Sequence, residues 1–223
     1  MPITTTLQYK NPKPSSSLSG WALMAGLYAL GVGNLGCSEL SADLSDPFAD
    51  EMVSFSPGTS AGFGEQSLPE VILGPPAGAG ANAGSLDVLS LGCGGEIVLR
   101  FDEPGIIDGP GVDLLVFENP FSSWLELAEV SVSVDGQQWK TWPCVADGAK
   151  PVGCAGVEPV LADGFDWAAA TDPASAGGDG FDLQELALTK VNFVRIRDLA
   201  TQSCQGTSAG FDLDALAAVH APW

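Results

Sequence analysis

The sequence predicts an all-β domain, an antiparallel β-sandwich that follows an N-terminal export signal. Short runs of β-branched and aromatic residues recur along the chain, and turn-forming residues separate them, with 28 Gly and 16 Pro among 223 residues. Hydrophobic residues make up 45% of the chain, enough for a packed core. Many short strands with glycine-rich connections are typical of a sandwich.

The charge of the chain disfavours two kinds of function. The formal net charge is −20, with 28 acidic and 8 basic residues. So few basic residues cannot neutralise a phosphate backbone, and we therefore expect no nucleic-acid partner. His220 is the single histidine, which disfavours both a histidine-rich metal site and a Ser-His-Asp triad.

Residues 1–36 are predicted to be a lipoprotein-type signal peptide. Lys10 and Lys13 are their only charges, and the apolar run over 21–32 is short for a membrane span of about 20 residues. The run leads to Cys37, whose surroundings resemble the lipobox of bacterial lipoproteins, where the cysteine is lipidated. Asn34 and Leu35 depart from the preferred Leu and small residue of that motif.

A lipidated Cys37 would anchor the protein in a membrane. Ordinary secretion with cleavage nearby and an uncleaved anchor are the alternatives. Ser38, in place of aspartate, favours the outer membrane where enterobacterial sorting applies. We therefore expect an exported protein of a bacterium, at the outer membrane or cell surface.

The rest of the chain is predicted to be a tether over 37–49 and one sandwich domain over 50–223. Because the signal carries two lysines and no acid, the remainder has a formal charge of −22. Strands are predicted at 96–101, 113–117 and 191–197, each bounded by Gly, Pro or Asp. In the last of these, Arg195 and Arg197 share a face with Phe193, opposite Val194 and Ile196, and we expect the two cations to pair with nearby carboxylates.

A hairpin is predicted over 128–142. Valines alternate with serines up to residue 134, and Asp135-Gly136 follows, a pair that favours a type I′ turn with positive φ at both residues. Two further segments allow a helix, 183–188 and 213–219. The second can equally be a final strand on which Leu213, Ala215 and Ala217 share a face.

Four cysteines follow Cys37, and in an exported chain they can pair in three ways. Cys144 and Cys154 flank a loop that contains Asp-Gly and Pro, and we pair them. Cys93 then pairs with Cys204 by subtraction, although Cys93 lies in an apolar run and a buried free thiol is the alternative.

Several segments resemble a family of bacterial cell-surface proteins: 84–92, 94–101, 108–113, 116–121, 128–136, 193–198 and 210–215. The resemblance covers most of the chain from about residue 50 to 220. Their order is similar to the galactose-binding-like jelly roll of discoidin-type and carbohydrate-binding modules. It implies a jelly-roll fold, a surface location and a structural calcium ion.

Acidic residues in glycine-rich turns are candidate calcium ligands, because calcium takes six to eight oxygen atoms. The candidates form three pairs: Asp108 with Asp113, Asp179 with Asp182, and Asp212 with Asp214. On a strand, residues 212 and 214 would share a face. The alternative is that these carboxylates only cap turns on an acidic surface. Residues 177–183 match one copy of a calcium-binding β-roll repeat, which requires stacked neighbours that this chain lacks.

Trp124 and Trp139 are candidate ligand-binding residues, since an exposed indole can stack on a sugar ring. Core or loop packing is the alternative. Glu118, Glu126 and Glu129 could supply the two carboxylates of a glycoside hydrolase. No spacing is specific for that chemistry, so we expect a non-enzymatic module that binds a cell-surface glycan or another surface protein.

Overall fold

Two antiparallel sheets make up the main part of the fold in the computed structural model, which describes residues 46–78, 80, 84–118, 124–147, 150–164 and 166–220. One sheet has the order β1-β3-β10-β6-β7, the second has the order β2-β11-β5-β8, and β4 pairs with β9. The strands are β1 (Glu51–Ser56), β2 (Leu89–Ser90), β3 (Glu96–Arg100), β4 (Ile106–Ile107), β5 (Leu114–Glu118), β6 (Ala128–Ser133), β7 (Lys140–Thr141), β8 (Asp179–Phe181), β9 (Lys190–Val191), β10 (Phe193–Asp198) and β11 (Asp212–Ala218).

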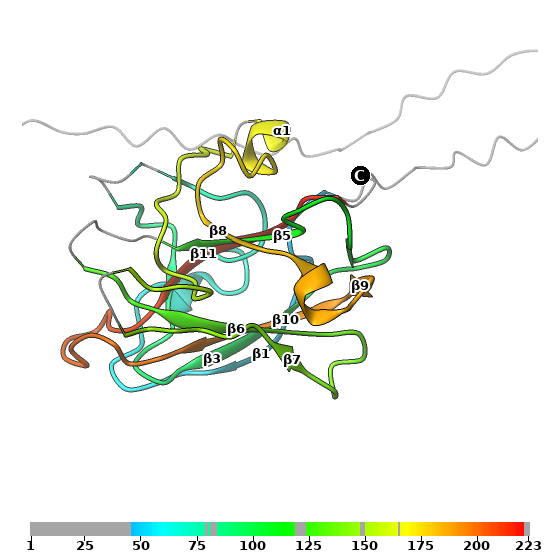
Figure 1. The fold of residues 1–223 in the computed structure, drawn as a ribbon. Helices are drawn as coiled ribbons and strands as arrows, with labels where there is room; N and C mark the ends of the chain where they lie inside the picture. Colours follow the sequence, from blue (N-terminus) through cyan, green and yellow to red (C-terminus); the bar gives the residue numbers. More distant parts are fainter. Residues whose placement is uncertain are drawn as a thin grey trace, which may run out of the picture. The chain divides into compact units, whose positions relative to one another are not determined.

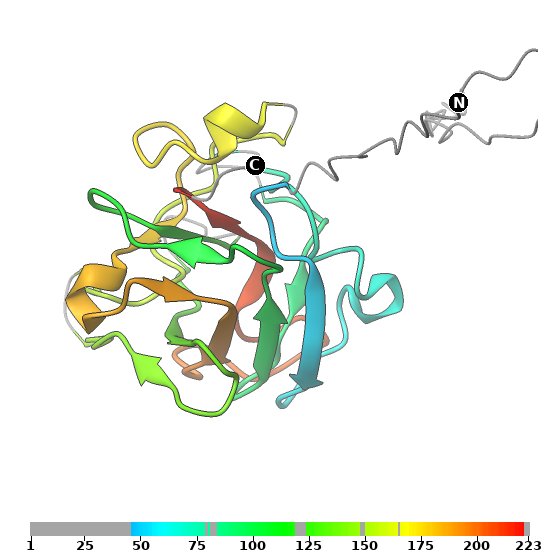
Figure 2. The ribbon, with the colours of Figure 1, turned by 90° about the vertical axis from the view of Figure 1, so that its right-hand side faces the viewer.

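The two sheets lie face to face as two layers (Figure 1). Their inner faces share one hydrophobic core, which includes Leu99 and Val130 from the first sheet and Leu114 and Leu213 from the second. Figure 2 shows β1, the blue strand, at the edge of the five-stranded sheet. The predicted antiparallel β-sandwich is therefore confirmed, while its jelly-roll topology stays a prediction.

Strand β10 confirms the predicted alternation. Val194 and Ile196 are fully buried, whereas Phe193, Arg195 and Arg197 lie on the outer face of the sheet. The strand pairs with β3 on one side and with β6 on the other. Side chains of successive strand residues point to opposite faces, so this central position buries one whole face.

Strand β5 is buried on both faces and shows no alternation of polar and apolar residues. Leu114 and Val116 belong to the main core, whereas Leu115 and Phe117 belong to a second cluster on the opposite face. That second cluster also holds Phe48 and Ala170, the last residue of helix α1 (Trp167–Ala170). A covering layer thus explains why this strand is a continuous apolar run.

Residues 213–219 were predicted to be a helix or a final strand, and most of them form the strand β11. The prediction that Leu213, Ala215 and Ala217 share one face of this strand is wrong. Leu213 belongs to the main core with Leu216, whereas Ala215 and Ala217 belong to the second cluster. The register with β5 shifts between Leu213 and Ala215. An irregularity of this kind adds a residue to one strand and reverses the faces beyond it.

The β6–β7 hairpin is confirmed, but its turn is not type I′. Gly136 has a φ of 70°, while Asp135 is not among the residues with positive φ. Seven residues separate the innermost pair, Val132 and Lys140. The side chain of Asp135 accepts hydrogen bonds from the backbone N–H groups of Gln137 and Gln138, at 2.9 and 2.8 Å. This Asx-type turn makes a wider loop than the two-residue alternative.

Residues 183–188 form a single 3-10 turn, η2 (Leu183–Leu186), which Asp182 caps by accepting from the N–H of Gln184. A second such turn is η1 (Glu65–Ser67). None of the helices in the described ranges has the length and apolar character needed to cross a bilayer.

Both predicted disulfides are present, Cys93–Cys204 and Cys144–Cys154. Disulfides persist in oxidising compartments, so the two bridges indicate an exported protein. The signal over 1–36, Cys37 and most of the tether lie outside the described residues.

Candidate metal centre and buried carboxylates

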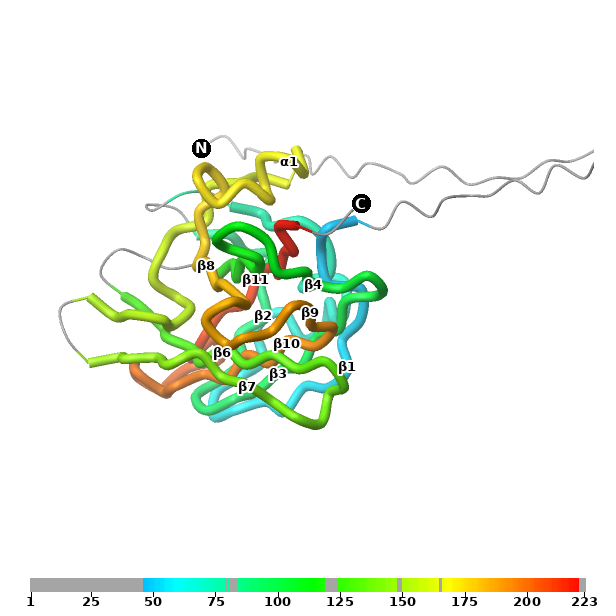
Figure 3. The backbone as a smooth tube through the Cα atoms, turned by 45° about the vertical axis from the view of Figure 1, so that its right-hand side comes forward, coloured from blue at the N-terminus to red at the C-terminus, as the bar shows by residue number. Residues whose placement is uncertain are grey.

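Three of the predicted calcium ligands converge at one end of the sandwich. Asp108 follows β4, Asp113 precedes β5, and Asp182 precedes η2. One oxygen from each carboxylate lies within 4.8 Å of the other two. Calcium binds oxygen at about 2.3–2.6 Å, so three atoms at this separation can share one ion. The neighbouring strands β4 and β9, which position Asp108, are seen in Figure 3.

Asp113 is the most deeply placed of the three and has no solvent exposure. Its carboxylate accepts 2.7 Å hydrogen bonds from the backbone N–H groups of Gly109 and Leu183. Burial raises the pKa of Asp113, these two bonds lower it, and the charge of Asp182 raises it further. Asp113 therefore holds together the two loops that carry Asp108 and Asp182.

Two polar atoms at this cluster are buried without a hydrogen-bond partner among the described residues, Asp108 Oδ1 and His220 Nε2. His220 Nε2 lies 3.7 Å from Asp113 Oδ1. The imidazole occupies space that only a glycine leaves open, because a Cβ on Gly109 would lie 2.4 Å from His220 Cδ2. A buried carboxylate oxygen without a partner, beside two further carboxylates, fits a bound cation.

The other three predicted ligands lie elsewhere and have partners of their own. Asp179 accepts from the N–H groups of Gly156 and Val157, at 2.7 and 3.0 Å. Asp214 accepts from the N–H of Ala77 at 3.0 Å, and Asp212 accepts from the hydroxyl of Ser90. Burial raises the pKa of Asp179 and of Asp212 to about 6 and that of Asp214 to about 7. Asp179 thus joins a neighbouring loop, while its predicted partner Asp182 belongs to the cation cluster.

The proposed hydrolase carboxylates are divided between two environments. Glu118 is 2% exposed and Glu126 is 8% exposed, whereas Glu129 is partly exposed on β6. Burial, followed by the charge of Asp212, raises the pKa of Glu126 to about 7. Burial is also the main reason that the pKa of Glu118 lies well above its usual range, and the charge of Glu126 contributes.

The candidate tryptophans differ in their surroundings. Trp139 lines a hollow of about 410 Å³ together with Asp135, Gln138, Lys140 and Leu188. The guanidinium of Arg195 lies 4.6 Å from the centroid of the Trp139 ring, a cation–π contact that holds the indole in place. Trp124 is 45% exposed, and its indole hydrogen-bonds to the Glu126 carboxylate.

The sequence pattern did not predict two features of these sites. His220 lies beside Asp113 although 107 positions separate them in the numbering. Asp198 ends β10, is 3% exposed, and accepts hydrogen bonds from three backbone amides. An aspartate directly after the alternating Val-Arg-Ile-Arg strand is the one sequence signal that points to Asp198, because strand ends are where carboxylates cap loops.

A comparison with protein-family models gave no match, and a comparison with curated protein sequences gave none either. The resemblance to one surface-protein family therefore stays a prediction. The fold and the two disulfides, taken alone, indicate an exported β-sandwich protein.

Proposed function

We propose that this chain is an exported, lipid-anchored surface protein of a bacterium whose jelly-roll sandwich is a binding module stabilised by calcium. The observation that carries the proposal is the convergence of Asp108, Asp113 and Asp182 within 4.8 Å around a buried, unpartnered oxygen. A calcium ion there would join the loops before β5 and before η2. Hard oxygen donors favour calcium over softer metals.

The proposed ligand is a carbohydrate of the cell surface, bound at the hollow beside Trp139. An indole face with Asp135, Gln138 and Lys140 around it offers both stacking and hydrogen bonds to hydroxyl groups. The hollow and the cation cluster share one segment: Asp182 belongs to the cluster, and Leu188 lines the hollow. Lys140 Nζ donates to the carbonyl of Leu186 at 2.6 Å, which fixes the segment against the hairpin.

Calcium titration followed by thermal melting tests the cation. Wild-type protein should melt at a higher temperature in millimolar calcium than in EDTA, because an ion that binds only the folded state stabilises it by mass action. Asp113→Asn should lose most of this rise, whereas Asp147→Asn, in the exposed loop closed by Cys144–Cys154, should keep it. A wild-type midpoint that does not respond to calcium would sink the calcium proposal.

A glycan array tests the ligand, with Trp139→Ala as the variant and Trp167→Ala as its control. Trp167 is also partly exposed, at 43%, but it lies on α1 and packs against Phe48. Binding should disappear with the first substitution and survive the second. Mass spectrometry of the membrane fraction tests the anchor, since an unmodified thiol on Cys37 would refute lipidation.

A glycan-active hydrolase is the second candidate, favoured by the pKa of about 7 for Glu126, a value suited to a general acid. It ranks second because both Glu118 and Glu126 are buried. Turnover of a glycan that is lost with Glu118→Gln would favour the enzyme over the binding module.

A further inference from the structure

The start of β11 is held by carboxylates from three other parts of the chain. The N–H of Gly210 donates to Glu126 Oε1 and the N–H of Phe211 donates to Asp198 Oδ2, both at 2.9 Å. The N–H of Asp212 donates to the carboxylate of Glu118. Three successive backbone amides are thus each bound by a separate acidic side chain. We call Glu118, Glu126 and Asp198 the carboxylate clamp.

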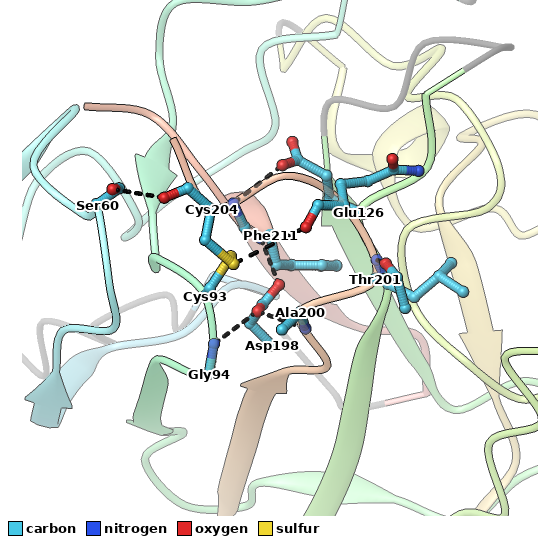
Figure 4. Close-up of a disulfide and its surroundings, with 12 residues drawn as sticks. Ser60, Cys93, Gly94, Glu126, Asp198, Ala200, Thr201, Cys204 and Phe211 are labelled. Atoms are coloured by element: carbon cyan, nitrogen blue, oxygen red, sulfur yellow. Dashed lines mark hydrogen bonds between the residues drawn. A yellow bond between two sulfur atoms is a disulfide. The ribbon is translucent and has the colours of Figure 1, made fainter. Parts of the chain in front are cut away.

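The carboxylate clamp connects the two sheets. Glu118 ends β5 in the four-stranded sheet, Asp198 ends β10 in the five-stranded sheet, and Glu126 precedes β6. Figure 4 shows Asp198 and Glu126 close to Phe211 and to the Cys93–Cys204 disulfide. Asp198 also accepts from the N–H of Gly94, next to Cys93, at 2.7 Å. Loss of the clamp would therefore loosen the start of β11, while Cys204 stays tied to Cys93 through the disulfide.

No lysine, arginine or histidine forms an ion pair with the carboxylate clamp in the part of the chain that the structure describes. Glu118 is 2% exposed, and its Oε2 atom has no hydrogen-bond partner there. A buried carboxylate is costly when it has no counter-ion and one of its oxygens has no hydrogen bond, and a carboxyl group avoids this cost by binding a proton.

Among the described residues, the charged groups that act on Glu118 and Glu126 are all acidic. Beyond burial, the charges of Asp212, Glu126 and Asp179 raise the pKa of Glu118, and the bond from the Asp212 N–H lowers it. Burial and the charges of Asp212 and Asp198 raise the pKa of Glu126 to about 7, although the hydrogen bonds from the N–H of Gly210 and from the indole of Trp124 lower it. Each loss of a proton therefore makes the next one harder.

We propose that Glu118 and Glu126 make the carboxylate clamp a proton-operated latch, which holds the start of β11 while these two side chains carry protons and loosens when they ionise. Between the ordinary pKa of a glutamate and the raised pKa of these two residues, the folded chain binds more protons than the unfolded chain. The free energy of unfolding is therefore greatest in acid and falls as the pH rises toward and beyond 7. The latch would hold the start of β11 in mildly acidic surroundings and loosen it in alkaline ones.

Thermal melting from pH 4.5 to 8.5, in EDTA so that the cation cluster does not contribute, tests the latch. The wild-type midpoint should fall by at least about 3 °C between pH 5 and pH 8. Glu118→Gln keeps a neutral acceptor for the N–H of Asp212 and should remove much of this fall. The raised pKa values of Asp179 and Asp214 also make the folded protein more stable at low pH. The test is therefore the difference in pH dependence between the wild type and Glu118→Gln.

Glu70→Gln is the matched control, because Glu70 is exposed and loses the same charge. It should keep the wild-type pH profile. Hydrogen exchange corrected for the intrinsic rate should show that amides 210–212 lose protection above pH 7 before the amides of β10 do. A Glu118→Gln profile as steep as that of the wild type, or early opening elsewhere in the sheets, would overturn the proposal.

If Glu118→Gln does not fold, carbon-13 titration of the wild-type carboxyl groups decides the question. Both Glu118 and Glu126 should titrate above the ordinary range of a glutamate, Glu126 at about 7. Ordinary titration of both buried residues would overturn the latch. Neither outcome bears on the cation cluster or on carbohydrate binding.

Discussion

Removal of the two disulfides one at a time should cost very different amounts of stability. The Cys93–Cys204 bridge joins residues 111 positions apart, and the Cys144–Cys154 bridge joins residues 10 positions apart. A disulfide stabilises mainly because it reduces the conformational entropy of the unfolded chain, by an amount that grows with the logarithm of the loop length. The entropy relation gives about 4.8 kcal/mol for the long loop and about 2.7 kcal/mol for the short one.

Urea unfolding of two double variants measures this difference. Cys93→Ala with Cys204→Ala should lower the free energy of unfolding by about 2 kcal/mol more than Cys144→Ala with Cys154→Ala does. Alanine avoids a buried hydroxyl at Cys154, which is 3% exposed. A typical domain has only about 5–15 kcal/mol of stability, so the first variant should be close to unfolding at 37 °C.

Equal losses in the two variants, or a larger loss for the short loop, would refute the entropic reasoning. The second result would instead indicate that the 144–154 loop is stabilised by native contacts that the bridge holds, such as the paired backbone bonds between Val145 and Val152. Reduction of the wild-type protein with a thiol provides the same comparison without substitution.

Three further substitutions probe single contacts. Gly109→Ala should lower the melting temperature and weaken the calcium response, because its Cβ would lie 2.4 Å from His220 Cδ2; the calcium titration measures both effects. Asp214→Asn should be more stable than wild type at pH 8 and similar at pH 5, since the pKa of about 7 means that stability is lost as the buried carboxyl ionises; melting at the two pH values checks it. Asp166→Ala removes the acceptor for the N–H groups of Ala168 and Ala169 at the start of α1 and should cost about 1 kcal/mol in urea unfolding.

Much of the fold could be predicted because it depends on local patterns. Alternation in 193–197 placed Val194 and Ile196 on one face of β10 and Phe193, Arg195 and Arg197 on the other, since side chains on a strand alternate between faces wherever the strand lies. The hairpin over 128–142 followed from its turn residues, although the serine and aspartate side chains of this loop selected a wider turn. Turn residues between Cys144 and Cys154 predicted their pairing for the same local reason.

The bulge in β11 could not be predicted, and it changed which residues face the core. Nothing in the composition of 212–218 distinguishes a regular strand from one whose register shifts between Leu213 and Ala215. The shift depends on how β5 pairs with β11, and therefore on residues almost a hundred positions away. This is why Ala215 packs with Phe117 and Phe48 in the second cluster and not with Leu213 in the main core.

The candidate site divides in the same way. Chain composition alone determined that the protein is strongly acidic, carries one histidine and has several carboxylates in turns. Only the tertiary structure decided that Asp182 joins Asp108 and Asp113, that His220 lies beside them, and that Glu118 is buried. Residue type is local, whereas the distance between two carboxylates and their exposure to water depend on how distant strands pack, and these two quantities determine whether an acidic side chain binds an ion, binds a proton or only keeps the surface hydrated.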